Sequence, residues 1–258
     1  MLKIQSISKR FGGLLALNNV ALAVNEGEIF SVIGPNGAGK TTLFNVLTGV
    51  YKPDGGRIIF AGADLTGLSP ERVAVRGVAR TFQNIRLFGA MTVFENLLVG
   101  QHAHIRYAYV DALLRTPRFF RQERAARTRA MELLEYMGLK DHAFELARNL
   151  AYGDQRRLEI ARALAVQPKL LLLDEPAAGM NPHETNELKD LIVRIRNERH
   201  VTILLIEHHM QVVMAISDRI AVLDYGSKIE EGTPEEIRKS PQVIEAYLGK
   251  GALETFHD

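Results

Sequence analysis

The stretch Leu150–Pro176, which reads LAYGDQRRLEIARALAVQPKLLLLDEP, decides the fold. A glycine-led helix start at Gly153 is followed by a basic amphipathic helix and then by four leucines that end in Asp174-Glu175. A short apolar run of this kind is typical of a strand buried on both faces of a parallel sheet. The stretch therefore predicts a helix and a buried strand that delivers two acids to the carboxyl edge of the sheet, where open α/β folds bind ligands.

A phosphate-binding motif lies upstream, in the order Gly34-Pro35-Asn36-Gly37-Ala38-Gly39-Lys40-Thr41. It follows the apolar run Ile29–Ile33 and precedes an apolar segment, Thr42–Thr48, as G-x-x-x-x-G-K-[ST] between a strand and a helix requires. Glycines let backbone N–H groups approach phosphates, and the helix start adds positive potential. We expect Lys40 to contact the β- and γ-phosphates of a nucleotide and Thr41 to bind Mg²⁺. A plain glycine turn is the alternative, which pattern and context together disfavour.

The two acids after the leucine strand complete this prediction. Asp174 is expected to hold Mg²⁺, directly or through water. Glu175 is placed to orient or deprotonate an attacking water. A solvated acidic turn is the alternative, and the phosphate loop makes it the weaker one.

Three further side chains are candidates on weaker grounds. His208 follows a second buried-type strand, Thr202–Ile206, and could reach a γ-phosphate from the same sheet edge. His209 is interpreted as a capping or surface residue. Gln83 could contact the metal or water, although spacing alone favours a surface glutamine. Phe11 could stack on an adenine ring or simply pack.

Composition bounds the class of protein. The 258 residues are 47% hydrophobic and 24% charged, with no cysteine and a net charge of +2. Disulfides and thiolate sites are therefore excluded, and the charge is too small to indicate nucleic acid. No apolar run approaches the ~20 residues that cross a bilayer. The start, MLKIQSISKRFGG, lacks the apolar core of a secretion signal, so we expect a cytoplasmic chain that reaches a membrane only through a partner.

Strand and helix patterns alternate along the chain. A cap residue followed by proline predicts a helix start at four places. A mostly helical block without a clear strand separates the two strand-containing halves. The alternation predicts a parallel sheet covered by helices. The expected strands also include Leu2–Ser8, Leu14–Val24, Arg57–Ala61, Ile220–Leu223 and its hairpin partner Lys228–Glu230; the cap–proline pairs are Ser69-Pro70, Asn181-Pro182, Thr233-Pro234 and Ser240-Pro241; the helical block is 92–165.

In combination and in order, these motifs resemble the ATP-binding subunits of ABC transporters over nearly the whole chain. The resemblance implies an α/β P-loop NTPase with a RecA-like parallel-sheet core, an N-terminal antiparallel β subdomain and an inserted α-helical subdomain. It implies one ABC domain, with 1–90 and 166–240 as core, 91–165 as the helical subdomain and 241–258 as a short tail.

The resemblance also implies roles for individual residues. Phe11 stacks on adenine, Gln83 couples the metal to a transmembrane partner, Glu175 is the catalytic base and His208 holds the γ-phosphate. Lys40 serves both binding and catalysis, and Thr41, Gln83 and Asp174 surround Mg²⁺. ATP is sandwiched between two such subunits, and the signature residues of one subunit read the nucleotide of the other. The expected nucleotide contacts are Phe11, Gly34, Pro35, Asn36, Gly37, Ala38, Gly39, Lys40, Thr41, Thr42, Ala151, Tyr152, Gly153, Asp154 and Gln155.

The chain departs from the general family pattern in two places, the signature and the loop after the two acids. The family signature is LSGGQ, whereas this chain has Leu150-Ala151-Tyr152-Gly153-Asp154. Ala151 has no hydroxyl to donate to a γ-phosphate, so recognition there falls to the backbone around Gly153. Asn181 replaces the usual aspartate, which keeps a helix cap but loses a charge.

The finer resemblance is to the ATPases of branched-chain amino acid importers, carried by LAYGDQRRLEIAR, DEPAAGMNP, LLIEHHM, GTPEEI and AYLG, and by the 101–130 insert. It implies membrane permease subunits, a second identical or related ATPase, an indirect periplasmic substrate-binding protein, and a peripheral location on the cytoplasmic face of the inner membrane. Urea or amide importers and the lipopolysaccharide exporter's ATPase look similar. A non-transport ABC protein and a P-loop kinase are the other hypotheses; the kinase would leave the 150–162 signature unexplained.

Arginines recur every third residue from Arg115 to Arg127, which places a basic stripe along a helix that Pro117 should begin. A solvated face is the favoured interpretation, and contact with anionic lipid headgroups is the alternative. Phe119 and Phe120 are expected to pack inward. No interleaved aromatic residues indicate nucleic-acid binding on this face.

Overall fold

The computed structural model describes residues 1–101, 111 and 113–248, which form two compact units. The first unit comprises residues 1–80 and 169 onward, and the second comprises residues 81–168. The ends of the 101–130 insert are described, whereas the part of that prediction on residues 102–110 and 112 lies outside the described residues. None of the helices in the described part of the chain is long and apolar enough to cross a membrane.

A six-stranded sheet organises the first unit, in the order β10-β9-β3-β8-β7-β6. All neighbours are parallel except the hairpin pair β9–β10, so the expected parallel core is confirmed. Sequence patterns missed the short edge strand β6 (Val78–Arg80), because three residues carry no readable period. The strands are β3 (Ile29–Ile33), β6 (Val78–Arg80), β7 (Leu170–Asp174), β8 (Thr202–Ile206), β9 (Arg219–Asp224) and β10 (Ser227–Gly232).

An antiparallel sheet of order β2-β1-β4-β5 forms the expected N-terminal β subdomain. Strand β4 starts at Gly55, two residues before the predicted start at Arg57. Gly56 has φ +87° there, and an added Cβ would lie 2.4 Å from the carbonyl oxygen of Gln5. The close approach of two strands thus requires glycine. The strands are β1 (Leu2–Phe11), β2 (Leu14–Val24), β4 (Gly55–Phe60) and β5 (Ala63–Asp64).

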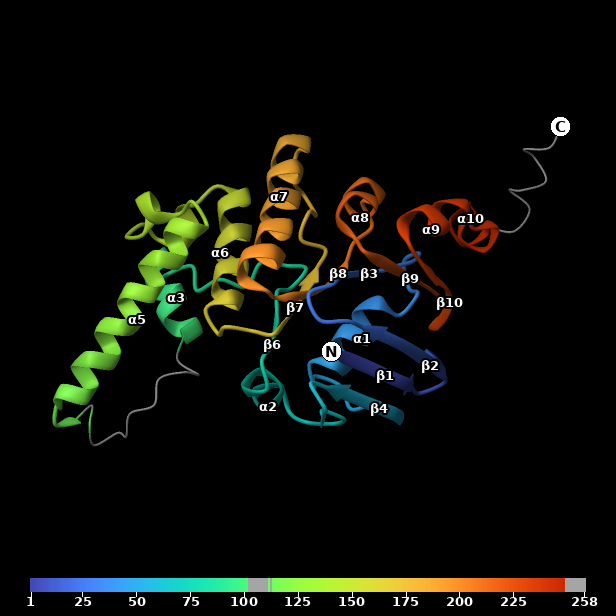
Figure 1. The fold of residues 1–258 in the computed structure, drawn as a ribbon, viewed down its shortest axis with the longest axis horizontal. Coiled ribbons are helices and arrows are strands. Elements are labelled where there is room, and N and C mark those ends of the chain that lie inside the picture. The colour runs from blue at the N-terminus through green and yellow to red at the C-terminus, as the bar shows by residue number, and fades with distance from the viewer. Residues whose placement is uncertain (102–110, 112, 249–258) are drawn as a thin grey trace. The chain divides into compact units, whose positions relative to one another are not determined.

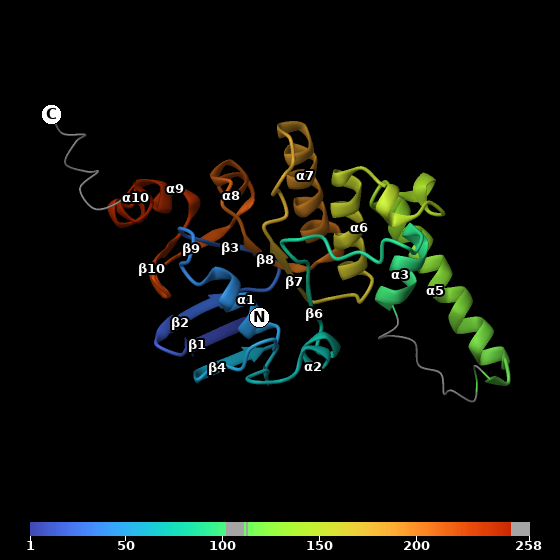
Figure 2. The ribbon, with the colours of Figure 1, turned by 180° about the vertical axis from the view of Figure 1, so that it is seen from behind.

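Both faces of the parallel sheet are buried, and successive residues supply opposite faces. Phe30 and Val32 of β3 face the antiparallel sheet and α1, while Ile33 joins a second apolar cluster under α8, α9 and α10. Figures 1 and 2 show α1 on the side of the antiparallel sheet and α7, α8 and α9 on the other. The helices of this unit are α1 (Lys40–Leu47), α2 (Pro70–Val75), α7 (Pro182–Arg199), α8 (Met210–Ile216), α9 (Pro234–Lys239) and α10 (Pro241–Leu248).

The four predicted cap–proline helix starts are confirmed, each with proline as the first helical residue. Asn181 and Thr233 form complete capping boxes with glutamates three residues later. Ser69 makes no side-chain cap, and Ser240 donates its hydroxyl to Glu230 instead. Helix α8 was not anticipated from the sequence.

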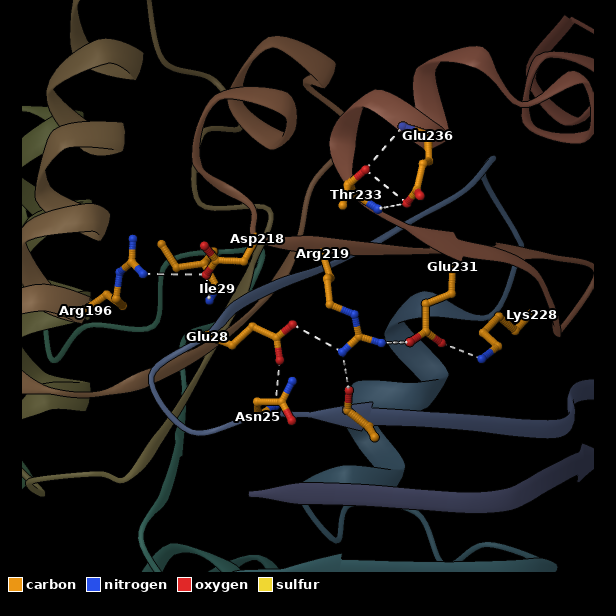
Figure 3. A network of polar contacts seen from close by, with 11 residues as sticks. Asn25, Glu28, Ile29, Arg196, Asp218, Arg219, Lys228, Glu231, Thr233 and Glu236 are labelled. Carbon is orange, nitrogen blue, oxygen red and sulfur yellow. Dashed lines mark hydrogen bonds and ion pairs between the residues drawn. The ribbon is translucent and has the colours of Figure 1, made fainter.

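A network of polar contacts around Arg219 connects strands of both sheets in the first unit (Figure 3). Arg219 donates to the carbonyl oxygen of Ala23 at 3.1 Å and to Glu28 at 3.3 Å, and it also pairs with Glu231. Glu231 accepts from Lys228 as well. These contacts connect β2, β9 and β10 through one guanidinium, whose fork geometry suits several acceptors.

The second unit is helical, as predicted for the block between the two halves. Gln101 donates its side-chain amide to the carbonyl oxygen of Ala126 at 3.1 Å, which ties α3 to α5. An added Cβ on Gly100 would lie 2.8 Å from the carbonyl oxygen of Arg162, so α3 and α6 approach closely at a glycine. The helices are α3 (Val93–Gln101), α5 (Pro117–Tyr136) and α6 (Tyr152–Leu164), with short 3-10 turns η2 (Lys140–His142) and η3 (Ala147–Asn149).

Candidate nucleotide site

The phosphate loop connects β3 to α1 and curls around Lys40. The ammonium of Lys40 is buried and donates to the carbonyl oxygens of Gly34 at 2.6 Å and Pro35 at 2.9 Å. Burial lowers the pKa of Lys40, and the carboxylates of Glu175 and Asp174 oppose that shift. Helix α1 starts at Lys40 itself, two residues before the predicted apolar segment, so Thr41 and Thr42 lie in its first turn. The loop thus presents a helix N-terminus and a cation together, which suits phosphate.

Two glycines of the loop are required by backbone geometry. Gly34 has φ +147°, and an added Cβ would lie 2.0 Å from the carbonyl oxygen of Leu223. Gly39 has φ +101° and would meet the carbonyl oxygen of Ala16 at 2.5 Å. The loop therefore packs directly on β9 and β2 without room for side chains.

Asp174 and Glu175 lie at the carboxyl end of β7, as predicted, and the two residues have different surroundings. Asp174 is buried and pairs with Arg80 at 2.7 Å. Arg80, the last residue of β6, also donates to Asn45 at 2.7 Å. Glu175 adopts a left-handed backbone, φ +47°, and its N–H donates to the carbonyl oxygen of Ile206 at 2.8 Å. The turn after β7 is thus fixed to the end of β8.

His208 lies beside Glu175, as its position after β8 predicts. The Nδ1 atom of His208 is 3.5 Å from a carboxylate oxygen of Glu175. The neighbouring Glu207, which sequence reasoning left without a role, is fully buried. Its two oxygens accept from the backbone N–H groups of Ala177 at 2.8 Å, His208 at 3.0 Å and His209 at 3.1 Å. Glu207 therefore holds together the loops that follow β7 and β8.

Phe11 lies at the end of β1 with its ring partly exposed. It packs edge-on against Tyr51, with ring centroids 5.1 Å apart, and the ammonium of Lys9 lies 5.4 Å from its centroid. Asp54 accepts from the N–H of Arg10 at 2.6 Å and from Lys9 at 3.0 Å, which fixes this end of the strand. The exposed ring face remains suited to stacking.

The signature segment and Gln83 belong to the second unit. Helix α6 begins at Tyr152 with Ala151 as its N-cap, so the prediction that Gly153 leads the helix is wrong by one residue. Ala151 offers no side-chain cap, and Gln155 donates back to the carbonyl oxygen of Leu150 at 2.9 Å. The first turn holds Tyr152, Gly153 and Asp154, so backbone N–H groups form its start.

A buried ion pair on α6 holds the backbone around Gln83. Arg156 pairs with Glu159 at 2.9 Å, and both side chains are almost fully buried. Arg156 donates to the carbonyl oxygens of Phe82 at 2.8 Å and Gln83 at 3.0 Å. Glu159 accepts the N–H groups of Phe82 at 3.3 Å and Arg86 at 3.2 Å. Sequence reasoning missed this pair, although opposite charges three residues apart between apolar positions were a visible signal.

A cavity of about 630 Å³ adjoins the outer side of the phosphate loop. It is bounded by Pro35–Ala38, by the β9–β10 turn at Asp224 and Tyr225, and by α10. Burial raises the pKa of the Tyr247 hydroxyl on α10, and a backbone hydrogen bond from Gly34 partly opposes this shift. The first residues of the predicted tail are therefore a helix beside the loop.

The donor set fits magnesium held jointly with phosphate. No cluster of three or more acidic, histidine or cysteine side chains able to hold a metal occurs among the residues that the structure describes. A site built from the Thr41 hydroxyl and the Asp174 carboxylate would supply only hard oxygen ligands. Mg²⁺ prefers such ligands and usually takes the remainder from phosphates and water.

Comparisons with known proteins identify the family. Residues 17–178 match the ABC transporter family, and residues 227–252 match the branched-chain amino acid ATP-binding cassette transporter family. The chain is 56% identical over 250 residues to the high-affinity branched-chain amino acid transport ATP-binding protein LivG of Salmonella typhimurium, covering 97% of this chain and 98% of that protein. It is 53% identical over 250 residues to BraF of Pseudomonas aeruginosa, with the same coverage.

Solved structures agree with this assignment. A nucleotide-free ATP-binding cassette from an ABC transporter superposes with a TM-score of 0.84 at 34% identity, covering 97% of this chain and 99% of that one. An ATP-binding cassette in its ADP conformation superposes with a TM-score of 0.82 at 32% identity and the same coverage. The expected ABC ATPase fold is confirmed, and this nucleotide-binding chain belongs to the ABC transporter family as one of its ATP-hydrolysing ATP-binding proteins.

Proposed function

We propose that this chain is the ATP-hydrolysing subunit of a branched-chain amino acid importer and works with separate membrane permease subunits. Identity of 53–56% to LivG and BraF over 97% of the chain supports this solute class over urea, amides or lipopolysaccharide. The match of residues 227–252 to the branched-chain family, which lies outside the ABC transporter match at residues 17–178, adds support. Non-transport ABC proteins and P-loop kinases are not supported by either finding.

The observation that carries the proposed mechanism is the meeting of one cation and two acids at one sheet edge. The carboxylates of Glu175 and Asp174 partly oppose the lowering of the Lys40 pKa by burial, and His208 lies 3.5 Å from Glu175. In this proposal Lys40 and the N-terminus of α1 bind the β- and γ-phosphates, with the backbone of Gly34–Thr42 around them. Glu175 removes a proton from the attacking water, and His208 positions the γ-phosphate.

Magnesium, when bound, neutralises charge on the β- and γ-phosphate oxygens. Thr41 and Asp174 would hold it, with Gln83 completing its surroundings. Phe11 would stack on the adenine ring. The signature segment would contact, through backbone N–H groups, the nucleotide held by a second ATP-binding subunit, identical or related. Its residues are Ala151, Tyr152, Gly153, Asp154 and Gln155. A subunit of this kind would lie peripherally on the cytoplasmic face of the inner membrane, with an indirect link to a periplasmic binding protein.

The test is Glu175→Gln in the assembled transporter. We expect ATP binding to persist while hydrolysis falls by at least about 100-fold, because the amide cannot accept the proton. Glu198→Gln on the exposed side of α7 is the matched control and should keep normal turnover. Near-normal hydrolysis by Glu175→Gln would overturn the assigned role.

The solute class needs a separate measurement. Reconstituted transporter should show ATPase stimulation by leucine, isoleucine or valine with the cognate binding protein, and none by urea. Stimulation by urea alone would reject the branched-chain assignment while leaving the ATPase mechanism intact.

A further inference from the structure

Two exposed leucines lie in a hydrogen-bonded turn just before helix α5. Thr116 donates its N–H to the carbonyl oxygen of Asp111 at 3.1 Å and its hydroxyl to the Asp111 carboxylate at 2.9 Å. Arg115 takes a left-handed conformation, φ +49°, to close this turn. Leu113 and Leu114 lie within it and are 82% and 68% exposed. Two hydrogen bonds thus hold two large apolar side chains out in solvent.

The helix itself extends the apolar tip. Thr116 caps α5 by accepting the N–H of Phe119 at 3.3 Å, so the turn and the helix form one continuous element. Phe120 is 56% exposed, and the expectation that it packs inward is wrong. The buried face of α5 is instead made by Ala126, Ala130, Leu133 and Leu134, farther along the helix.

Positive charge gathers at the same end. Residues 113–129 contain six arginines and one glutamate, a net charge of +5, against +2 for the whole chain. Arg121, Arg124 and Arg127 are all exposed. The other end of the helix carries Glu132 and Glu135, and the latter pairs with Lys140 at 3.1 Å. The charge is therefore polarised along α5 toward the apolar tip, where the helix N-terminus adds further positive potential.

We propose that Leu113–Arg127, called the α5 tip below, binds the anionic phospholipid surface of a membrane. A basic stripe alone is normally a solvated helix face. Large apolar side chains exposed beside it change that interpretation, because basic residues flanking exposed leucine and phenylalanine are typical of segments that lie in a membrane interface. The arginines meet lipid phosphates, and Leu113, Leu114 and Phe120 enter the boundary between headgroups and acyl chains.

An acidic protein surface is the rival partner, and charge complementarity alone would fit it too. The apolar residues favour lipid, because Leu113, Leu114 and Phe120 are all exposed next to the arginines, as in segments that lie in a membrane interface. The inference is independent of the transported solute and of the assignments at the nucleotide site.

The test is flotation of the purified full chain, without permease, with two kinds of vesicle. One is phosphatidylcholine alone, and the other is an equal mixture of phosphatidylcholine and phosphatidylglycerol. We expect binding to the anionic vesicles only, weakened by salt. The triple variant Arg121→Gln, Arg124→Gln, Arg127→Gln should lose at least about tenfold in partitioning, since each basic residue near such a surface contributes measurably.

Matched control variants test whether vesicle binding depends on this surface or only on the total charge and hydrophobicity of the protein. The triple variant Arg57→Gln, Arg72→Gln, Arg76→Gln makes the same charge change on the first unit and should bind normally. The double variant Leu113→Ser, Leu114→Ser should weaken binding and keep its salt dependence, whereas Val75→Ser, also at an exposed position, should not. Unchanged thermal unfolding and nucleotide binding of each variant would establish that it is folded.

Three outcomes would overturn the proposal. Equal binding by the wild type and the α5-tip variants would show that another surface meets the lipid. Absence of vesicle binding, together with loss of permease assembly in the arginine variant, would assign the tip to a protein partner. If the protein binds no vesicles and the arginine variant still assembles with the permease, the α5 tip is only a solvated helix face. None of these outcomes would alter the Glu175→Gln result, so the two proposals fail separately.

Discussion

Arg80 and Asp174 form a buried ion pair in which a guanidinium nitrogen and a carboxylate oxygen lie 2.7 Å apart. The two residues are the last of neighbouring parallel strands, β6 and β7. Arg80 also donates to Asn45 and lies over the ring of Phe44, at 5.4 Å from its centroid. The pair therefore joins helix α1 of the phosphate loop to the strand that carries the acids.

Replacing Arg80 with methionine should destabilise the protein by about 3–5 kcal/mol, because it removes the guanidinium that pairs with a buried carboxylate. Chemical denaturation of wild type and variant measures this difference. Arg72→Met, at an exposed position on α2, is the control and should change little. If Arg80→Met unfolds like the control, the pair does not stabilise this edge. The double variant Arg80→Met, Asp174→Asn should recover part of the loss.

Removing the Arg156–Glu159 pair should affect turnover more than nucleotide affinity. Arg156→Met deletes two donors to the backbone of Phe82 and Gln83, so the segment carrying Gln83 loses its fixed position. We expect kcat of the assembled ATPase to fall by about 10-fold or more, since misplaced groups cost rate even without direct contact. KM for ATP should change far less. Lys140→Met, at an exposed position, is the control, and a fall in affinity alone would argue against this role.

Gly34→Ala should abolish nucleotide binding and destabilise the fold. Its φ of +147° and the carbonyl of Leu223, 2.0 Å from an added Cβ, leave no space for a methyl group. A cost of about 1–3 kcal/mol is expected for the strain. Thermal unfolding and a nucleotide-binding titration check both effects. Gly13→Ala introduces the same methyl where no atom lies within 4 Å, and it should be neutral.

Asp54 should make stability depend on pH in the acid range. The N–H of Arg10, and then the ammonium of Lys9, lower its pKa below the usual 3.8. A depressed aspartate pKa contributes stability above the unfolded-state pKa, and that contribution disappears as pH falls through the folded-state pKa. Asp54→Asn should therefore unfold at a lower temperature than wild type at neutral pH and match it in strong acid. A pH-independent difference would contradict this, and Asp190→Asn on α7 is the control.

Local signals predicted the elements whose structure depends on neighbouring residues. The phosphate loop, the leucine strand and the capping boxes at Asn181 and Thr233 all follow from spacings of a few residues. Their geometry is set by backbone conformation and short-range hydrogen bonds, which the sequence displays directly.

Long-range partners were beyond the reach of such signals. Arg80 meets Asp174 across 94 residues, and Arg156 meets the backbone of Phe82 across 74. Nothing in the local sequence distinguishes Glu207 from other charged residues after a strand, because its role depends on three backbone N–H donors that the fold brings to it. Phe120 was assigned inward by its hydrophobicity, but the helix turns its face to solvent, because alanines and leucines already fill the interior. Tertiary packing decided each of these cases.

The left-handed backbone of Glu175, φ +47°, means that the position is held against conformational preference. Glycine or asparagine would occupy this turn with less strain, which is of the order of 1 kcal/mol for such a residue. Neither has a side chain that could take a proton from water. Selection for thermal stability alone would therefore favour replacements here that abolish ATP hydrolysis. Thermal stability and catalysis thus place opposite demands on this one residue.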